Sequence, residues 1–301
     1  MRRCFKCGKR ASLYLFQHRA AFCREHYLEW YLKRLDETIK EFGMFSREDR
    51  VLVAVSGGKD SLSLWDALKK LGYKADGFYI DLGIGEYSEK SRRLCEEFAK
   101  ARGLKLHILH LGLEIATIPQ IKSIEKRPAC SYCGQLKRYY MNKLAKDKGY
   151  TVIATGHNLD DESATLFSNI INWNMEYLER QSPVLKGGEG FVRKVKPLFK
   201  FTEKENALYA FLSGIDFVEE ECPFSEGANS IEYKKILSQL EERSPGTKLR
   251  FYMDFLRKCR PLLGAKEIDL RACQACGEPT IAELCSVCKL RQRLNSRILS
   301  S

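Results

Sequence analysis

The sequence predicts an α/β protein built on a doubly wound parallel sheet and flanked by two small zinc-binding modules. Between residues 51 and 171, apolar runs of strand length alternate with longer segments whose apolar positions recur at helical spacing. This alternation is typical of a parallel sheet covered by helices. Cysteine pairs spaced as metal ligands stand near both ends of the chain. A length of 301 residues is sufficient for one sizeable core with small appendages.

Composition narrows the class of protein. No apolar run approaches the roughly eighteen residues that a membrane span needs, and the amino terminus lacks a signal-peptide core, so we expect a cytoplasmic protein with no membrane contact. In that setting the 12 cysteines indicate metal binding or chemistry rather than disulfides. The high content of Lys, Arg and Glu is compatible with a thermophile source.

The net charge of +12 is concentrated at the two ends of the chain. Residues 1–50 hold 12 Lys and Arg against 7 Asp and Glu, and residues 243–301 hold 12 against 5, whereas residues 51–242 hold 27 of each. Basic surface at both ends is typical of a nucleic-acid-binding protein. A merely solvated Lys- and Arg-rich surface is the alternative reading of the charge alone.

The amino-terminal segment carries the first predicted zinc site. Its four ligands form a C-x2-C knuckle and a C-x2-H knuckle: Cys4, Cys7, Cys23 and His26. Three thiolates and one imidazole are suited to tetrahedral zinc. A helix is expected to follow over about residues 26–42 and to end at Gly43.

The central motif is the stretch VLVAVSGGKDS, residues 51–61. Its apolar run predicts a strand buried on both faces, and the residues beyond it predict an amphipathic helix. Gly57 and Gly58 allow a sharp turn and close approach of the backbone to a ligand. The free N–H groups and the dipole of the following helix favour phosphate oxygens. The loop does not match the Walker A pattern, and an ordinary glycine-rich turn is the bland alternative.

Further strands are predicted at residues 75–80, 104–109 and 151–155, with helices at about 88–102 and 162–171. Asp81 follows the first of these strands, at the edge where parallel sheets place their ligands. The last strand leads into Gly156 and the pair Asp160 and Asp161. One aspartate can cap the helix that begins there, and the other can hold Mg²⁺ or orient phosphates.

A second group of cysteines lies inside the predicted α/β domain. Cys130 and Cys133 form a C-x2-C pair before a helix that runs to about residue 148, and Lys137 lies one turn beyond Cys133. No second pair stands nearby to complete a zinc site, so Cys222 is the candidate for a third ligand. Structural thiols and a solvated helix lysine are the alternative readings.

The carboxyl-terminal third begins with a Gly- and Lys-rich connection over residues 185–197. A capping box at Thr202 and Glu205 then predicts a helix start, and another helix is expected at about residues 231–242. Two C-x2-C knuckles near the end form the second predicted zinc site: Cys273, Cys276, Cys285 and Cys288.

Together these motifs resemble one family over nearly the whole chain. The SGGKDS loop resembles the PP-loop of N-type ATP pyrophosphatases, a HUP-like fold, and the full set of motifs resembles the two-thiouridine synthetase family of tRNA-modifying enzymes. The resemblance divides the chain into a zinc module with its linker helix (1–43), a catalytic domain (44–264) and a second zinc module with a basic tail (265–301). His26 in place of a fourth cysteine favours the branch that thiolates ribothymidine at position 54 over the branch that thiolates wobble uridine.

The resemblance implies the following chemistry. ATP with Mg²⁺ adenylates the C2 oxygen of a tRNA uridine, and sulfide then displaces AMP. The implied ATP-binding residues are Ala54, Val55, Ser56, Gly57, Gly58, Lys59, Asp60, Ser61, Asp81, Gly156 and Asp161. Lys137 and Asp161 are the implied catalytic residues together with the three central cysteines, which would hold a [4Fe–4S] cluster with one open iron. A persulfide route through two of these cysteines is the alternative.

The implied partners are tRNA, a ubiquitin-like sulfur-carrier protein with a C-terminal thiocarboxylate, and a second copy of the chain in a homodimer. Two readings compete with tRNA thiolation. A pure RNA-binding module would need neither Lys59, Asp161 nor Cys130. A lysidine synthetase or amide-forming ligase would keep the pyrophosphatase chemistry but use an amine instead of sulfur, and would not need the three central cysteines.

Overall fold

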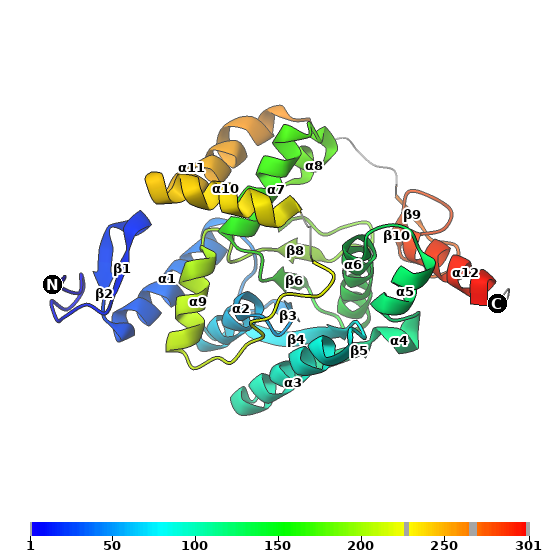
Figure 1. The fold of residues 1–301 in the computed structure, drawn as a ribbon, viewed down its shortest axis with the longest axis horizontal. Helices are drawn as coiled ribbons and strands as arrows, with labels where there is room; N and C mark the ends of the chain where they lie inside the picture. The colour runs from blue at the N-terminus through cyan, green and yellow to red at the C-terminus, as the bar shows by residue number, and fades with distance from the viewer. Residues whose placement is uncertain (1, 226–228, 265–269, 299–301) are drawn as a thin grey trace.

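A computed structural model describes residues 2–225, 229–264 and 270–298 of the chain (Figure 1). Across these residues the central sheet has six strands, in the order β5-β4-β3-β6-β8-β7. The strands are β3 (Arg50–Val55), β4 (Lys74–Asp81), β5 (Leu106–His110), β6 (Val152–Thr155), β7 (Val184–Leu185) and β8 (Arg193–Val195). All neighbouring pairs are parallel except β7 with β8. The predicted doubly wound parallel sheet is confirmed.

The helices of this part of the chain lie between these strands or follow β8. They are α2 (Lys59–Lys70), α3 (Gly85–Arg102), α4 (Leu111–Glu114), α5 (Ile118–Ile124), α6 (Ala129–Asp147), α7 (Leu159–Ile171), α8 (Met175–Arg180), α9 (Glu203–Leu212), α10 (Asn229–Arg243) and α11 (Thr247–Asp254). The chain winds from β3 outward through β4 to β5, then returns across the sheet to β6 on the other side of β3. The strand order therefore reverses between β3 and β6, and a crevice opens at such a reversal.

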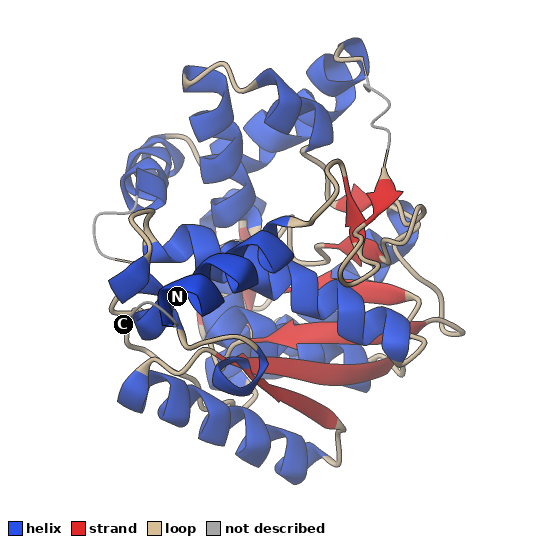
Figure 2. Cartoon of the chain, turned by 90° about the vertical axis from the view of Figure 1, so that its right-hand side faces the viewer, coloured by secondary structure: helices blue, strands red, loops and turns tan. Residues whose placement is uncertain are grey.

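Both faces of the sheet are buried, as Figure 2 shows with helices in front of the strands and behind them. Along β3 the side chains alternate: Val51, Val53 and Val55 join one apolar core with α1, α2 and α9, while Leu52 joins a second core with α5 and α6. An unbroken apolar run is the pattern expected of a strand covered on both faces.

A small module lies at each end of the chain (Figure 1). The first consists of the hairpin β1 (Leu13–Leu15) and β2 (Ala20–Phe22), followed by the long helix α1 (Arg24–Glu41). The second consists of the hairpin β9 (Arg271–Ala272) and β10 (Pro279–Thr280), followed by α12 (Ser286–Ile298). The predicted domain boundary at residue 265 falls within 265–269, outside the described residues.

The expected helices and strands agree with the structure to within about three residues, with two corrections. Residues 185–197, predicted as a connection, contain β8 and part of β7, and these two strands form one edge of the sheet. Strands of two or three residues are too short to show the alternation of polar and apolar residues that predicts a strand. Gly187 and Gly188 in the turn therefore made the segment resemble a loop. The second correction concerns Cys130 and Cys133, which lie inside the first turns of α6 rather than before the helix.

Across the described part of the chain, no helix combines the length and the apolar character that a membrane crossing requires.

Candidate active site

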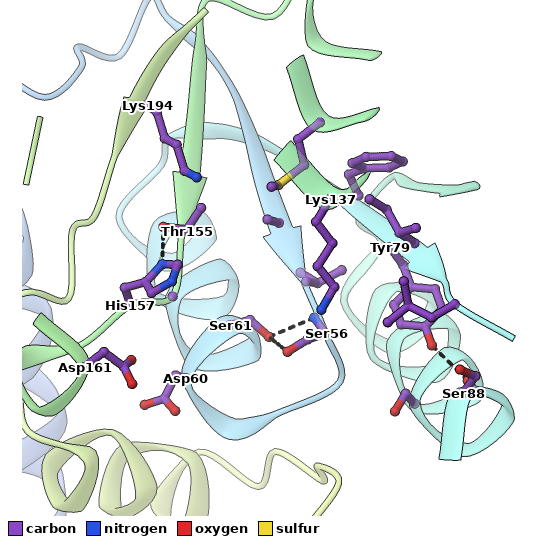
Figure 3. Close-up of a pocket in the computed structure, with 18 of the residues that line it drawn as sticks. Ser56, Asp60, Ser61, Tyr79, Ser88, Lys137, Thr155, His157, Asp161 and Lys194 are labelled. Atoms are coloured by element: carbon purple, nitrogen blue, oxygen red, sulfur yellow. Dashed lines mark hydrogen bonds between the residues drawn. The ribbon is translucent and has the colours of Figure 1, made fainter. Parts of the chain in front are cut away.

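A cavity of about 400 Å³ opens at the carboxyl ends of β3 and β6, where the strand order reverses (Figure 3). Seven of the predicted ATP-binding residues line it: Ala54, Val55, Ser56, Asp60, Ser61, Gly156 and Asp161. The facing wall comes from α3 and α6, which contribute Ser88, Ser91, Lys137 and Met141. The cavity is thus enclosed by the loop after β3, the loop after β6 and helices from both faces of the sheet.

The loop after β3 is shaped to bind an anion. Gly57 has a φ of +78°, and a Cβ added there would lie 2.9 Å from the Ser91 carbonyl oxygen, so only glycine fits. The Ser56 N–H donates to Ser61 Oγ at 3.1 Å, and that hydroxyl donates to the Gly58 carbonyl at 3.1 Å. Among the residues that the structure describes, no side chain caps the amino terminus of α2. Its backbone N–H groups and the helix dipole are therefore available to phosphate oxygens.

Asp60 is fixed by two amides. Its Oδ1 accepts from Asn158 Nδ2 at 3.1 Å and from Asn206 Nδ2 at 2.7 Å, and its Oδ2 lies 3.3 Å from Lys59 Nζ. Burial raises the pKa of Asp60, and the nearby charge of Asp161 adds to the rise, although Lys59 and the two amides oppose it. The orientation of this carboxylate thus depends on α7 and α9 as well as on its own loop.

Asp161 occupies the third position of α7 and closes a capping box with Asn158. Its Oδ1 lies 2.6 Å from Lys234 Nζ. Burial acts to raise the pKa of Asp161, but the Lys234 ammonium outweighs burial and lowers that pKa overall. The sequence reading assigned one aspartate of the pair to capping and the other to the ligand. In the structure Asp161 caps the helix and also lines the cavity.

The two loops are packed tightly together. A Cβ on Gly156 would lie 2.8 Å from the Ser61 backbone nitrogen, so a larger residue would push the two loops apart. Four of the predicted ATP-binding residues do not line the cavity: Gly57, Gly58, Lys59 and Asp81. Asp81 instead lies 3.2 Å from His110 Nδ1 and accepts from the Gly83 N–H at 2.9 Å.

Several cavity residues were missed by the sequence reading. Tyr79 lies on β4 beside Ser88, whose carbonyl oxygen accepts from the tyrosine hydroxyl at 2.8 Å. Lys194 comes from β8, the strand that was not predicted. His157 also lines the cavity. Its Nδ1 lies 2.8 Å from Thr155 Oγ1, and burial lowers the pKa of the imidazole.

The three central cysteines gather next to this cavity. Cys130 Sγ donates to the Phe224 carbonyl at 3.2 Å, which brings the first turn of α6 against the segment that contains Cys222. Burial raises the pKa of the Cys133 thiol; the Lys137 ammonium opposes this rise, whereas thiolate charge on Cys222 and Cys130 would add to it. Lys137 also lines the cavity, so the same lysine borders the cysteines and the cavity.

Within the described residues, two groups of side chains are close enough to hold a single metal ion, each with its four ligand atoms within 4.8 Å of one another. They are the two predicted sets, Cys4, Cys7, Cys23 and His26, and Cys273, Cys276, Cys285 and Cys288. Cys7 Sγ lies 4.0 Å from Cys23 Sγ, and Cys276 Sγ lies 3.7 Å from Cys285 Sγ. Such distances are close to the roughly 3.8 Å between sulfurs on a tetrahedral zinc ion.

Both end modules are attached to elements of the active site. In the first module, His18 Nε2 lies 2.8 Å and Arg34 Nη1 lies 2.7 Å from Glu205 Oε1 at the start of α9. In the second, Glu278 accepts from Asn142 at 2.7 Å and from Lys146 at 2.9 Å, both on α6. The modules therefore brace the two helices that carry Asn206 and Lys137.

Comparison with known proteins assigns the family. Residues 29–226 match the PP-loop domain family. The tRNA-5-methyluridine(54) 2-sulfurtransferase of Thermus thermophilus is 46% identical over 95% of this chain and 90% of its own length. The tRNA-5-methyluridine(54) 2-sulfurtransferase of Thermotoga maritima is 45% identical over 98% of this chain and 98% of its own length. The solved structure of the U34-tRNA thiolase NcsA from Methanococcus maripaludis with its [4Fe-4S] cluster superposes with a TM-score of 0.83 and 25% identity, covering 98% of this chain and 97% of that one. The resemblance inferred from the motifs is thus confirmed: the chain belongs to the tRNA 2-sulfurtransferases built on a PP-loop domain.

Proposed function

We propose that this chain catalyses ATP-dependent 2-thiolation of a tRNA uridine, with ribothymidine at position 54 as the target. The single observation that carries this proposal is the position of Lys137, which lines the nucleotide cavity and also borders the Cys133 thiol. A sulfur-transfer reaction needs the activated nucleotide and the sulfur-bearing thiols at one place. An amine ligase would have no use for that arrangement.

ATP would bind with its phosphates at the amino terminus of α2, where Ser56 and Ser61 shape the loop. Asp60 and Asp161 both line the cavity and are close enough that the charge of Asp161 raises the pKa of Asp60. Two neighbouring carboxylates beside a phosphate site fit Mg²⁺, which in nucleotide enzymes is held by one or two carboxylates together with phosphate oxygens. Bound there, the ion would neutralise phosphate charge.

In the first step, the C2 oxygen of the uridine attacks the α-phosphorus of ATP, an O–P bond forms and pyrophosphate leaves. The C2 oxygen thereby becomes part of a good leaving group. Sulfide then attacks C2, the C2–O bond breaks, and AMP departs with the former carbonyl oxygen. The Lys137 ammonium would stabilise the negative charge that develops in these steps. The buried end of the cavity, with Tyr79 and Met141 in its wall, would limit access of water.

Cys130, Cys133 and Cys222 fit a [4Fe–4S] cluster by their chemistry and their spacing. Three thiols gather beside the cavity, yet they do not belong to the two described groups tight enough for a single ion. A cubane is larger than a single ion and accepts more widely spaced thiolates, and three ligands leave one iron open. Such a cluster would supply a site that holds sulfide. The structural relative NcsA carries a cluster of this type.

Each end module would hold one structural Zn²⁺. The ligand types and the short distances among the four ligand atoms support zinc in both modules. The attachments of these modules to α9 and α6 support a bracing role for the ions. The division into domains at 1–43, 44–264 and 265–301 remains part of the proposal.

The target position rests on the relatives. The chain is 45–46% identical to two sulfurtransferases named for 5-methyluridine at position 54, but 25% identical to the wobble-uridine thiolase. Thiolation of the wobble uridine by the same chemistry is the alternative. The sulfur-carrier protein, the homodimer and a cytoplasmic location stay predictions.

Two assays test the proposal. The first measures AMP and pyrophosphate from ATP, and we expect pyrophosphate release to need Mg²⁺ and tRNA, and AMP release to need a sulfide source as well. Release of AMP with an amine in place of sulfide would contradict sulfur transfer.

The second assay measures iron, acid-labile sulfide and the EPR spectrum after anaerobic reconstitution. Wild type should hold about four irons, Cys222→Ala should lose or degrade the cluster, and Cys259→Ala should match wild type. Cys259 is a suitable control because it is an exposed cysteine outside the central group. Zinc alone in the wild type, with no iron, would remove the cluster from the mechanism and favour the persulfide route.

A further inference from the structure

Lys194 places a second lysine side chain in the cavity, on the side away from the PP-loop (Figure 3). It lies on β8, where it pairs with Ile153 of β6. Paired residues on neighbouring parallel strands share a face, and Ile153 belongs to the core beneath α6, so Lys194 faces the same side as Lys137. Of the described residues that line the cavity, Lys137 and Lys194 are the two lysines, and none is an arginine.

The ammonium of Lys194 is unusual for its lack of a partner. Among the described residues, nothing accepts a hydrogen bond from it and no carboxylate lies within ion-pair distance. Its neighbour Lys196, two residues on, lies 2.7 Å from Glu162, and Lys59 lies 3.3 Å from Asp60. Lys194 is half-buried in the wall of the cavity. A lysine partly withdrawn from water without a partner is costly, and such groups are typical of ligand-binding sites.

The surroundings of Lys194 make it still more receptive to an anion. Burial, together with the charges of Lys196 on its own strand and Arg138 on α6, lowers the pKa of Lys194 to about 8, while Glu162 on α7 acts in the opposite direction. The Glu162 carboxylate is already engaged, since it also accepts from the Tyr252 hydroxyl at 2.8 Å. A bound anion would relieve this local excess of positive charge.

We propose that Lys194 binds a phosphate group of the reacting nucleotides, opposite the PP-loop. The inference rests on the proposed function, which brings two phosphate-bearing molecules to this cavity, ATP and tRNA. The phosphate therefore belongs either to the triphosphate of ATP or to the tRNA backbone beside the target uridine. In both cases Lys194 forms a charge-assisted hydrogen bond to a phosphate oxygen in a partly dehydrated site.

The test measures binding without turnover, using Lys194→Met, Lys194→Arg and Lys186→Met in the zinc- and iron-loaded protein. Lys186 is exposed, lies in the same hairpin and does not line the cavity, so Lys186→Met removes an equal charge outside the site. The test has two arms. In the ATP arm, calorimetric titration with α,β-methylene ATP measures nucleotide affinity. In the tRNA arm, the affinity for unmodified tRNA is measured as a function of salt concentration.

We expect Lys194→Met to lose about tenfold or more in affinity for one of the two ligands. If the phosphate is that of ATP, the loss occurs with α,β-methylene ATP alone. If it is that of tRNA, nucleotide affinity is unchanged and the slope of log K against log salt falls by about 0.7 to 0.9, the value of one phosphate contact. Lys186→Met should match wild type in both arms, and urea unfolding checks that the Lys194→Met fold is intact.

The pH dependence separates a binding role from a structural one. Wild-type affinity for the ligand concerned should be constant below about pH 8 and fall above it as Lys194 loses its proton. Lys194→Arg keeps its charge and should remove that fall. If the folded Lys194→Met variant binds both ligands as tightly as the wild type does, the proposal is overturned. Neither arm of the test depends on product formation. Phosphate binding by Lys194 can therefore be confirmed even if the protein shows no thiolation activity, and thiolation can be confirmed even if Lys194 binds no phosphate.

Discussion

Glu205 joins the amino-terminal module to the catalytic domain, and Glu205→Gln tests how much that junction contributes. The carboxylate is 1% exposed. Its Oε1 is approached by His18 and Arg34 from the first module, at 2.8 Å and 2.7 Å. Its Oε2 accepts from the Thr202 N–H at 2.7 Å and closes the capping box of α9. Glutamine keeps the shape and the capping bond, so the substitution removes the charge and the acceptor that faces Arg34.

Two independent estimates give the size of the effect. Burial alone would raise the pKa of Glu205, but Arg34 and His18 outweigh it and lower that pKa from 4.5 to about 2. A depression of this size corresponds to about 3 kcal/mol of folding free energy at neutral pH. Breaking a buried ion pair by removing one partner costs about 3–5 kcal/mol in other proteins. We therefore expect Glu205→Gln to lower the free energy of unfolding by about 3 kcal/mol.

Urea unfolding of the zinc-loaded protein at several pH values measures this loss. A depressed carboxyl pKa stabilises the fold above the unfolded-state pKa and ceases to do so as pH falls toward the folded-state value. The difference in the free energy of unfolding between wild type and Glu205→Gln should thus be constant from pH 8 to about 5 and shrink below about 4.5. The control is Glu37→Gln, whose exposed pairing with Lys33 at 3.7 Å should contribute less than about 1 kcal/mol. A Glu205→Gln variant within 1 kcal/mol of wild type at pH 7 would refute this account of the junction.

Three shorter predictions follow from other sites. Gly77→Ala should destabilise the fold by about 1–3 kcal/mol in urea unfolding, because the new Cβ would lie 2.4 Å from the buried ring of Trp65; an effect under 0.5 kcal/mol would show that the ring moves freely. Gly156→Ala should weaken binding of α,β-methylene ATP by about tenfold or more in calorimetry, since its Cβ would press on the Ser61 nitrogen, and unchanged affinity would contradict the tight packing of the two loops. Cys276→Ser should remove one of two equivalents of zinc in elemental analysis, and retention of both would contradict the role of Cys276 as a zinc ligand.

The sequence was most informative where local patterns and tertiary structure agree. The buried strand Arg50–Val55, the glycine turn after it and the alternation of later elements each have a short-range cause, and all were predicted. The hairpin of β7 and β8 was missed because β8, a strand of three residues, pairs with β6, over 40 residues away in the chain, and the two-residue strand β7 pairs in turn with β8.

The residues of the candidate site also differ in whether a local sequence pattern predicts them. Residues in recognisable motifs, such as Ser61 and Asp161, were placed at the cavity from the sequence. Lys194 could not be placed at the cavity from the sequence, because no motif near it indicates a ligand and its strand was predicted to be a connection. The third-ligand role of Cys222 was suggested by elimination, and the contact of its neighbour Phe224 with Cys130 depends on chain folding that no local pattern encodes.

The most direct test of the central claim is mass spectrometry of nucleosides from unmodified and 5-methyluridine-containing tRNA after anaerobic incubation with the reconstituted protein, ATP, Mg²⁺ and sulfide. The account predicts 2-thio-5-methyluridine at position 54, formed by wild type and the Cys259→Ala control but lost in Lys137→Ala and Cys222→Ala. A 2-thiouridine at the wobble position would keep the chemistry and change the target. A tRNA that gains no sulfur while ATP is still cleaved to AMP would contradict the account at its centre.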